Sequence, residues 1–195
     1  DLPPLTLRVN TLKISRESLR QKLTSDGFDA QLTKYSPDGI TLNTSASPVQ
    51  KTDFFKAGFL RIQDEAAQLI AYLIDQREEL SLLDACAGTG GKTTHLAAMI
   101  KNEGRIVAVD RNPERIAELK QEAIRLGVKN IEAQTADLCT DLPASFKERF
   151  DWVLVDAPCS GTGTLRRNPE IKWRTTEKDV HQFATAQKII LKHSS

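Results

Sequence analysis

The 195-residue sequence has only three cysteines, and no long apolar run. Three is an odd number, and none of the cysteines lies in a CxxC or His-rich cluster, which argues against a disulfide framework and a zinc site. No apolar stretch approaches the roughly 20 residues of a membrane-spanning helix, and no secretory signal pattern opens the chain. We therefore predict a cytoplasmic protein with no metal ion and no membrane association.

Net charge is also nearly absent, because 27 Lys and Arg residues face 26 Asp and Glu residues. The total charge of +1 does not by itself indicate a nucleic-acid partner. A composition of 39% hydrophobic and 27% charged residues is that of a globular domain, and it excludes a disordered, collagenous or coiled-coil chain. We expect a monomer with one medium domain, or one domain with a small appendage. The start at Asp1 rather than Met suggests a piece of a longer protein.

The first part of the sequence predicts a small α+β unit. Alternating apolar and polar residues over 6–10 indicate a strand, and Ser15 can cap a helix that ends near Gly27. Two further short strands, 29–33 and 40–43, flank a turn at Pro37-Asp38-Gly39. A second helix should follow, with Ala66, Leu69, Ile70, Leu73 and Ile74 on one face. We divide the chain into residues 1–58 and 59–195.

From residue 80 onward, apolar strands alternate with helices. Helices are predicted over 92–101 and from the Asn112 cap to Gly127, the second with Ile116, Leu119, Ala123 and Ile124 facing inward. Continuous apolar strands separated by helices indicate a parallel sheet that is covered on both faces. The fold class is therefore α/β, with a Rossmann-like doubly wound sheet. The four predicted strands are 82–86, 105–110, 130–136 and 150–155.

Each of these strands carries a carboxylate at or next to its end, namely Asp84, Asp110, Asp137 and Asp156. Ligands of open parallel sheets bind outside the carboxyl ends of the strands. A carboxylate after the second strand can accept hydrogen bonds from ribose hydroxyls, and Asp137 could bind the exocyclic amine of an adenine. The pattern predicts a site for a cofactor that contains a nucleoside.

The turn after the first of these strands, Cys86 to Lys92, leaves three cofactors open. Gly91-Lys92-Thr93 matches the end of a P-loop, but that motif needs a glycine where Cys86 stands. A dinucleotide site needs a glycine in place of Thr93. S-adenosylmethionine tolerates this spacing best.

A Pro-Cys pair follows the last strand, and it makes Cys159 a candidate nucleophile. The segment just after it is locally basic and includes Trp173, so a non-catalytic RNA-binding module is an alternative. In that case the phosphate-binding residues would be Arg166, Arg167, Lys172 and Arg174.

These motifs resemble those of the RNA cytosine-5 methyltransferases that act on bacterial small-subunit ribosomal RNA. The matching segments are 7–11, 62–67, 84–93, Asp110-Arg111, Asp137 and 156–173. The resemblance implies a class I S-adenosylmethionine-dependent methyltransferase fold, cut short at its C-terminus, with an RNA-recognition-like N-terminal subdomain. It also implies that RNA, most simply ribosomal RNA, is the partner.

The resemblance further assigns roles to residues. Asp156 and Cys159 are the catalytic candidates, with Asp156 at cytosine N3 and Cys159 assisting product release. The attacking cysteine of the family lies in a later Thr-Cys motif that this sequence lacks, so we expect no full turnover from the chain alone. Cys139 is expected to be structural, and His95, His181 and His193 to be surface or helix-end groups. The implied cofactor contacts are Cys86, Ala87, Gly88, Thr89, Gly90, Gly91, Lys92, Asp110, Arg111, Asp137 and Asp156.

Overall fold

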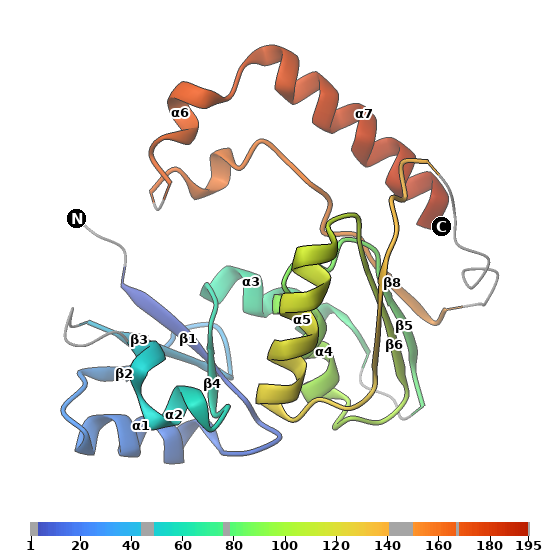
Figure 1. The fold of residues 1–195 in the computed structure, drawn as a ribbon. Helices are drawn as coiled ribbons and strands as arrows, with labels where there is room; N and C mark the ends of the chain where they lie inside the picture. The colour runs from blue at the N-terminus through green and yellow to red at the C-terminus, as the bar shows by residue number, and fades with distance from the viewer. Residues whose placement is uncertain (1–3, 44–48, 76–78, 141–149, 167, 195) are drawn as a thin grey trace.

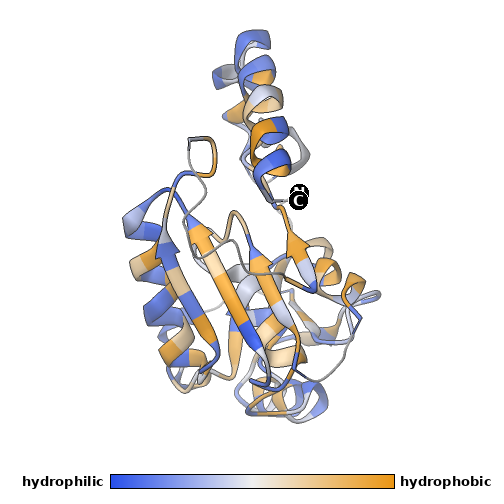
Figure 2. Ribbon diagram, turned by 90° about the vertical axis from the view of Figure 1, so that its right-hand side faces the viewer, coloured by the Kyte–Doolittle hydropathy of each residue, from blue (hydrophilic) through white to orange (hydrophobic). Residues whose placement is uncertain are grey.

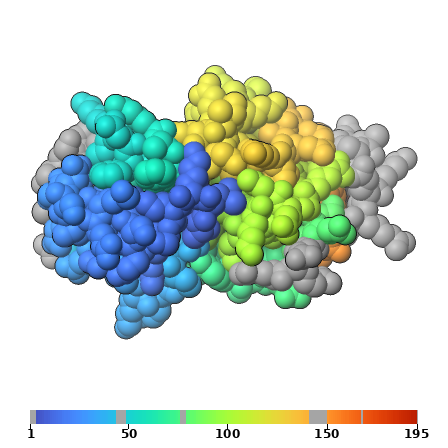
Figure 3. Space-filling view, turned by 90° about the horizontal axis from the view of Figure 1, so that it is seen from below, coloured from blue at the N-terminus to red at the C-terminus, as the bar shows by residue number. Residues whose placement is uncertain are grey.

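Two four-stranded sheets pack side by side in this protein (Figure 1). The computed structural model describes residues 4–43, 49–75, 79–140, 150–166 and 168–194. The N-terminal unit and the larger unit that follows it are in broad contact when the molecule is seen from below (Figure 3). None of the helices in the described part of the chain combines the length and the apolar character that crossing a membrane requires.

The N-terminal unit is an antiparallel sheet with helices and a short 3-10 turn packed against it. Its strands lie in the order β2-β3-β1-β4, and its core is formed by leucines and isoleucines of β1, α1 and β3. The unit therefore has the α+β architecture that the sequence predicts. Its elements are β1 (Leu5–Val9), α1 (Arg16–Ser25), β2 (Ala30–Leu32), β3 (Gly39–Leu42), η1 (Val49–Lys51), α2 (Asp53–Lys56) and β4 (Leu60–Ile62).

Strand β1 is buried on both faces, which explains why the two units stay together. Leu7 and Val9 pack into the core of the N-terminal unit, while Arg8, on the opposite face, is almost completely buried as well. Helix α1 begins after Ser15, whose hydroxyl accepts a hydrogen bond from the Ser18 amide at 3.2 Å, as the predicted cap requires.

Two features of this region differ from the prediction. Strand β4, which the sequence pattern did not reveal, pairs with β1, so the first sheet extends past residue 58; the division at that residue stays a prediction. The helix expected over 66–74 is an α-helix only in α3 (Glu65–Leu69) and continues as the 3-10 turn η2 (Ile70–Leu73). Leu73, expected on the buried face, is exposed.

The second unit has a fully parallel sheet in the order β7-β6-β5-β8. Its central strands are largely apolar (Figure 2). Helices 91–99 and 113–126 pack against one face, and Ile190 of the last helix packs against the other. The predicted α/β class is confirmed. The elements are β5 (Ser81–Asp84), α4 (Gly91–Met99), β6 (Arg105–Asp110), α5 (Pro113–Leu126), β7 (Ile131–Thr135), β8 (Trp152–Leu154), the 3-10 turn η4 (Thr162–Thr164), α6 (Ile171–Arg174) and α7 (Glu177–Ser194).

Successive residues of β5 point to opposite faces of the sheet and meet different helices. Leu82 packs with α4 and α5, whereas Leu83 packs with Ile190 of α7. Helix α5 starts at the predicted Asn112 cap and ends at Gly127. Ile124, predicted to face inward, is 80% exposed. Ala123, as predicted, and Leu126 are buried with Ile116 and Leu119, whereas Ile124 lies beside this buried stripe on the solvent side.

The prediction for His95 is wrong, because this side chain is buried under the N-terminal unit. Its Nε2 lies 3.0 Å from Oδ2 of Asp38, which also accepts a 2.6 Å hydrogen bond from the Tyr72 hydroxyl. Burial lowers the pKa of His95 to about 4, so the imidazole is neutral at pH 7. Of the other two histidines, His181 is exposed, and His193 is half-buried with Nδ1 2.7 Å from the Leu138 carbonyl.

Candidate active site

The turn between β5 and α4 depends on two glycines with left-handed backbone angles. Gly88 has φ 54° and Gly90 has φ 81°. A Cβ at Gly90 would also stand 2.7 Å from the side chain of Leu119, so no other residue fits there without a shift. The turn thereby brings the free amides of the first turn of α4 to the carboxyl edge of the sheet.

Asp110, the last residue of β6, secures this turn from the neighbouring strand. Its Oδ2 accepts a hydrogen bond from the Gly88 amide at 2.9 Å, and its Oδ1 accepts one from the Asn112 amide at 2.9 Å. The side chain is mostly buried. One carboxylate therefore fixes the glycine turn and the start of α5 together.

A cleft of about 640 Å³ opens along this edge of the sheet. All of the predicted cofactor residues except Gly90 border it, and the catalytic candidate Cys159 does so too. The structure thus brings together residues that are up to 73 positions apart in the chain, as the strand-end argument predicts. The predicted residues that line the cleft are Cys86, Ala87, Gly88, Thr89, Gly91, Lys92, Asp110, Arg111, Asp137, Asp156 and Cys159.

Cys86 and Cys139 are poorly suited to be nucleophiles. Burial and the nearby carboxylates of Asp84 and Asp110 raise the pKa of the Cys86 thiol to about 12. Burial and Asp137 also raise the pKa of Cys139. Both thiols stay protonated at neutral pH, in keeping with the prediction that neither Cys86, a cofactor-turn residue, nor Cys139, a structural one, is the nucleophile. Cys159, in contrast, is exposed at the mouth of the cleft.

The loop that carries Cys159 is tied to both sides of the cleft. Lys92, in the first turn of α4, donates a hydrogen bond to Oδ2 of Asp156 and forms an ion pair with it. Gln187 of α7 donates to the Pro158 carbonyl at 2.8 Å. The position of Lys92 near a helix N-terminus, unfavourable for the helix dipole alone, is explained by this carboxylate.

The predicted basic segment lies outside the cleft lining. Arg166, Lys172 and Arg174 are exposed, and Arg167 lies outside the described residues. Trp173 is 83% exposed, and the Lys172 ammonium stands 5.4 Å from the centroid of its ring. An aromatic ring between cations is a surface suited to RNA.

Two family models together match most of the chain. The model of the 16S rRNA methyltransferases RsmB/F matches residues 71–195, and that of the ferredoxin-like domain of RsmF/B-like methyltransferases matches residues 1–50. The chain belongs to the RsmB/F family of 16S rRNA methyltransferases. The resemblance drawn from the sequence motifs is confirmed, and S-adenosylmethionine, the predicted cofactor, is the cofactor of the family.

Relatives of this RsmB/F chain are found in bacteria and animals. It is 35% identical over 190 residues to the probable ribosomal RNA small subunit methyltransferase B of Bacillus subtilis, matching 97% of this chain and 42% of the relative. It is 36% identical to a 28S rRNA (cytosine-C(5))-methyltransferase of Mus musculus, matching 96% of this chain and 24% of the relative. The chain thus spans less than half the length of these relatives.

A solved structure confirms the fold of this family member. A methyltransferase homolog protein from Pyrococcus horikoshii matches it with a TM-score of 0.84 at 29% identity, over 99% of this chain and 60% of the other.

Several cleft residues of this RsmB/F chain were not predicted as site residues from the sequence. Gln63 lies in one of the segments that carry the family resemblance, and Arg115 lies one turn after Asp110-Arg111, so both had a usable local signal. The residues of α7 had none, because only the tertiary fold returns that helix to the sheet. The unpredicted residues are Gln63, Ala67, Ala85, Arg115, Ala136, Leu138, Cys139, Pro158, Phe183, Ala186 and Ile190.

Asp84 is the most deeply buried carboxylate of the cleft. Burial raises its pKa to about 6, although the hydroxyl of Thr93 donates to its Oδ2 at 2.7 Å and opposes the shift. At pH 7 the side chain is therefore ionised inside the protein at a cost in stability.

Asp84→Asn is expected to make unfolding less dependent on pH. The folded pKa of about 6 exceeds the unfolded value of about 3.9. The stabilisation from this group is therefore complete below about pH 4 and is lost as the pH rises through 6. The unfolding free energy of the variant minus that of the parent should rise by about 2 kcal/mol between pH 4 and pH 7.5. Urea unfolding at both pH values measures this, and a difference that does not change with pH would contradict it.

Proposed function

We propose that this chain binds S-adenosylmethionine in the cleft and serves the methylation of cytosine C5 in ribosomal RNA. The observation that carries the proposal is the cleft itself. One cavity is bordered by the glycine turn, by the carboxylates at the strand ends and by the Cys159 loop. The family membership supports the reaction class.

The charges around the cleft suit this cofactor better than a nucleoside triphosphate. The lining includes four carboxylates, those of Asp84, Asp110, Asp137 and Asp156, and three cations, those of Lys92, Arg111 and Arg115. Lys92 is already paired with Asp156, and Arg115 lies 3.9 Å from Asp110. S-adenosylmethionine carries a sulfonium and an ammonium, which carboxylates attract, whereas they would repel a triphosphate. This argues against the P-loop alternative.

Three parts of the cleft would hold the three parts of the cofactor. Asp110 would accept hydrogen bonds from the ribose hydroxyls, and Asp137 would bind the adenine amine. The amides at the start of α4 favour an anionic group such as the carboxylate of the amino-acid part. When bound, the cofactor supplies a methyl group on a positively charged sulfur.

The residues beside the cofactor site would act on the cytosine. C5 of cytosine is a poor nucleophile, and it becomes reactive when a cysteine thiolate adds to C6. Asp156, in its protonated form, would donate a hydrogen bond to the ring at N3, where negative charge develops during this addition. After methyl transfer, a base takes the C5 proton and the thiol leaves. By resemblance to the family, Cys159 assists this release and a cysteine of a Thr-Cys motif makes the attack.

The proposal predicts that the chain binds S-adenosylhomocysteine with one site and does not bind Mg-ATP. Isothermal titration calorimetry at pH 7.5 measures both, with circular dichroism to show that the sample is folded. Binding of Mg-ATP in place of S-adenosylhomocysteine would favour a P-loop protein. No binding of either ligand to the folded chain would contradict the cofactor site.

A second candidate function is RNA binding through the exposed Trp173, which Lys172 and Arg174 flank in the sequence. Such a surface would bind single-stranded RNA by stacking and phosphate contacts, with affinity that falls steeply with salt. Salt-dependent RNA binding together with cofactor binding fits the methyltransferase. RNA binding without any cofactor affinity would instead identify a non-catalytic RNA-binding module.

A further inference from the structure

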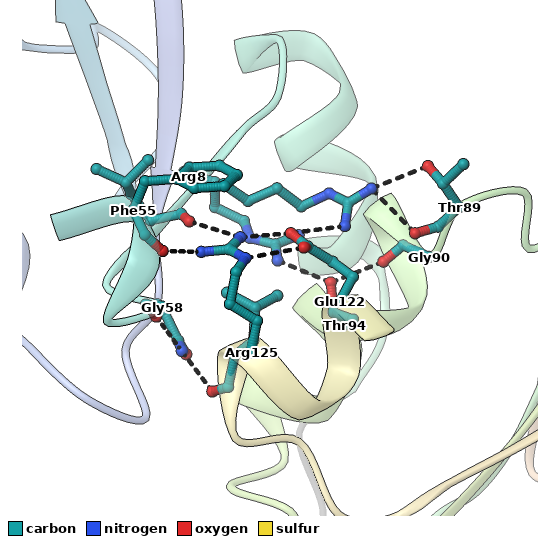
Figure 4. A network of polar contacts seen from close by, with 12 residues as sticks. Arg8, Phe55, Gly58, Thr89, Gly90, Thr94, Glu122 and Arg125 are labelled. Atoms are coloured by element: carbon teal, nitrogen blue, oxygen red, sulfur yellow. Dashed lines mark hydrogen bonds and ion pairs between the residues drawn. The ribbon is translucent and has the colours of Figure 1, made fainter. Parts of the chain in front are cut away.

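A cluster of buried charged side chains lies where the two units meet (Figure 4). Arg8 of β1 and Arg61 of β4 come from the N-terminal unit, and Glu122 and Arg125 come from α5. Glu122 pairs with Arg61 at 3.1 Å and with Arg125. Arg8 and Arg61 therefore lie against the second unit, next to the glycine turn.

Arg61 ends on the glycine turn itself. Its Nη2 donates to both the carbonyl oxygen and the side-chain hydroxyl of Thr89, each at 3.0 Å. Thr89 directly precedes Gly90, the left-handed residue that caps α4, so the guanidinium binds the turn next to this glycine.

Arg8 makes similar hydrogen bonds to the first residues of α4. One of its nitrogens donates to the Gly91 carbonyl and the other to Oγ1 of Thr94 at 2.9 Å. That hydroxyl in turn donates to the Gly90 carbonyl at 2.7 Å. Arginines of the N-terminal unit thus bond the carbonyls of residues 89 and 91 directly, and that of residue 90 through Thr94.

Fixing these carbonyls also fixes the amides of the cofactor turn. In a planar trans peptide the C=O and the next N–H point in opposite directions. The peptides that carry the amides of residues 90 to 92 are therefore held by the hydrogen bonds that Arg61, Arg8 and Thr94 make on their other side. The Gly90 amide itself donates to the Ala87 carbonyl at 2.9 Å. Gly91 and Lys92 line the cleft, where their two amides would face the cofactor.

The cluster is costly to bury, which argues that it does more than join the units. Burial lowers the pKa of Arg8 to about 9 and also lowers that of Arg61. Replacing buried ion clusters by apolar residues is often neutral or stabilising. A contact made only for stability could therefore have been apolar.

We propose that Arg61 is a positioning residue that, with Arg8, holds the glycine turn in the geometry that binds the cofactor. The inference rests on the proposed cofactor site. It makes the N-terminal unit part of the cofactor site, although its two arginines act only through the backbone of the turn.

Arg125 offers a matched control for Arg61. The two side chains are similarly buried, at 16% and 13% exposure, and share Glu122. Arg125 also joins the units, because it donates to the carbonyls of Phe55 and Leu60. Within the described part of the chain, however, its hydrogen bonds are to Glu122, Phe55 and Leu60 and not to the turn.

The test compares Arg61→Met with Arg125→Met in the 195-residue chain. We expect Arg61→Met to weaken S-adenosylhomocysteine binding about tenfold, the effect of losing one or two hydrogen bonds to the turn. Arg125→Met should change the affinity less than about twofold, even if both variants lose similar stability in urea. Amide hydrogen exchange of Gly90, whose amide donates to the Ala87 carbonyl within the turn, should accelerate in the ligand-free protein only in Arg61→Met. Arg61→Lys, which keeps one donor, should recover part of both effects and serves if the methionine variant does not fold.

Equal losses of affinity in the two methionine variants would overturn the proposal, as would unchanged affinity and exchange in Arg61→Met. If the parent chain does not bind S-adenosylhomocysteine, the proposed function fails. The exchange comparison then still decides whether Arg61 holds the turn.

Discussion

Arg8→Met is expected to lower the free energy of unfolding by about 3 kcal/mol or more. The side chain is almost fully buried and serves three acceptors, namely Gln63 at 2.7 Å, the Gly91 carbonyl and Thr94. Methionine fills much of the same volume but donates no hydrogen bond. Buried acceptors that lose their donor cost about 1–3 kcal/mol each, with some relief from relaxation. Urea unfolding at pH 7.5, followed by far-ultraviolet circular dichroism, measures the loss.

Arg20→Met is the control for this prediction. Arg20 lies on α1 and pairs with Glu17 at 3.0 Å across one helical turn, in contact with solvent. Exposed pairs of this kind contribute about 0.5 kcal/mol, so the unfolding curve should barely shift. A loss for Arg8→Met as small as that for Arg20→Met would show that the arginine cluster contributes little to joining the units.

The contacts between the two units, including those of Arg8, could not be predicted from the sequence. The alternation of residues 6–10 predicts a strand correctly, but it assigns Arg8 to a solvent-facing side. In the folded chain that side meets Thr94, 86 positions further on. His95 was misjudged for the same reason, since its partner Asp38 comes from the other unit. Local periodicity reports one buried face and cannot report a second face that tertiary packing covers.

The candidate site was more predictable, because topology rather than side-chain packing creates it. The carboxyl ends of neighbouring parallel strands share one edge, so Asp84, Asp110 and Asp156 had to converge once the strands were recognised. The glycine turn is local in sequence, as are the cap at Asn112 and the stop at Gly127. Strand β4 was missed because three residues carry too little pattern, and its strand conformation depends on pairing with β1.

Asp110→Ala is expected to weaken S-adenosylhomocysteine binding about 100-fold, or about 3 kcal/mol. Two losses add up in this variant. The carboxylate can no longer accept hydrogen bonds from the ribose, and charge-assisted bonds of this kind are among the stronger ones. The Gly88 amide also loses its 2.9 Å acceptor, which frees the turn. Titration calorimetry at pH 7.5 measures the change.

Two further variants separate these losses from a general weakening of the fold. Asp110→Asn keeps an acceptor for Gly88 but removes the charge, so its affinity should fall between those of the parent and Asp110→Ala. Asp151→Ala is the matched control, since Asp151 also accepts a backbone amide, that of Ser81 at 2.8 Å, but at the start of β5, the opposite edge of the sheet from the cleft. It should leave the affinity within about twofold of the parent. If Asp110→Ala binds as tightly as Asp151→Ala, the carboxylate at the end of β6 does not hold the cofactor, and the ribose must be bound elsewhere in the cleft.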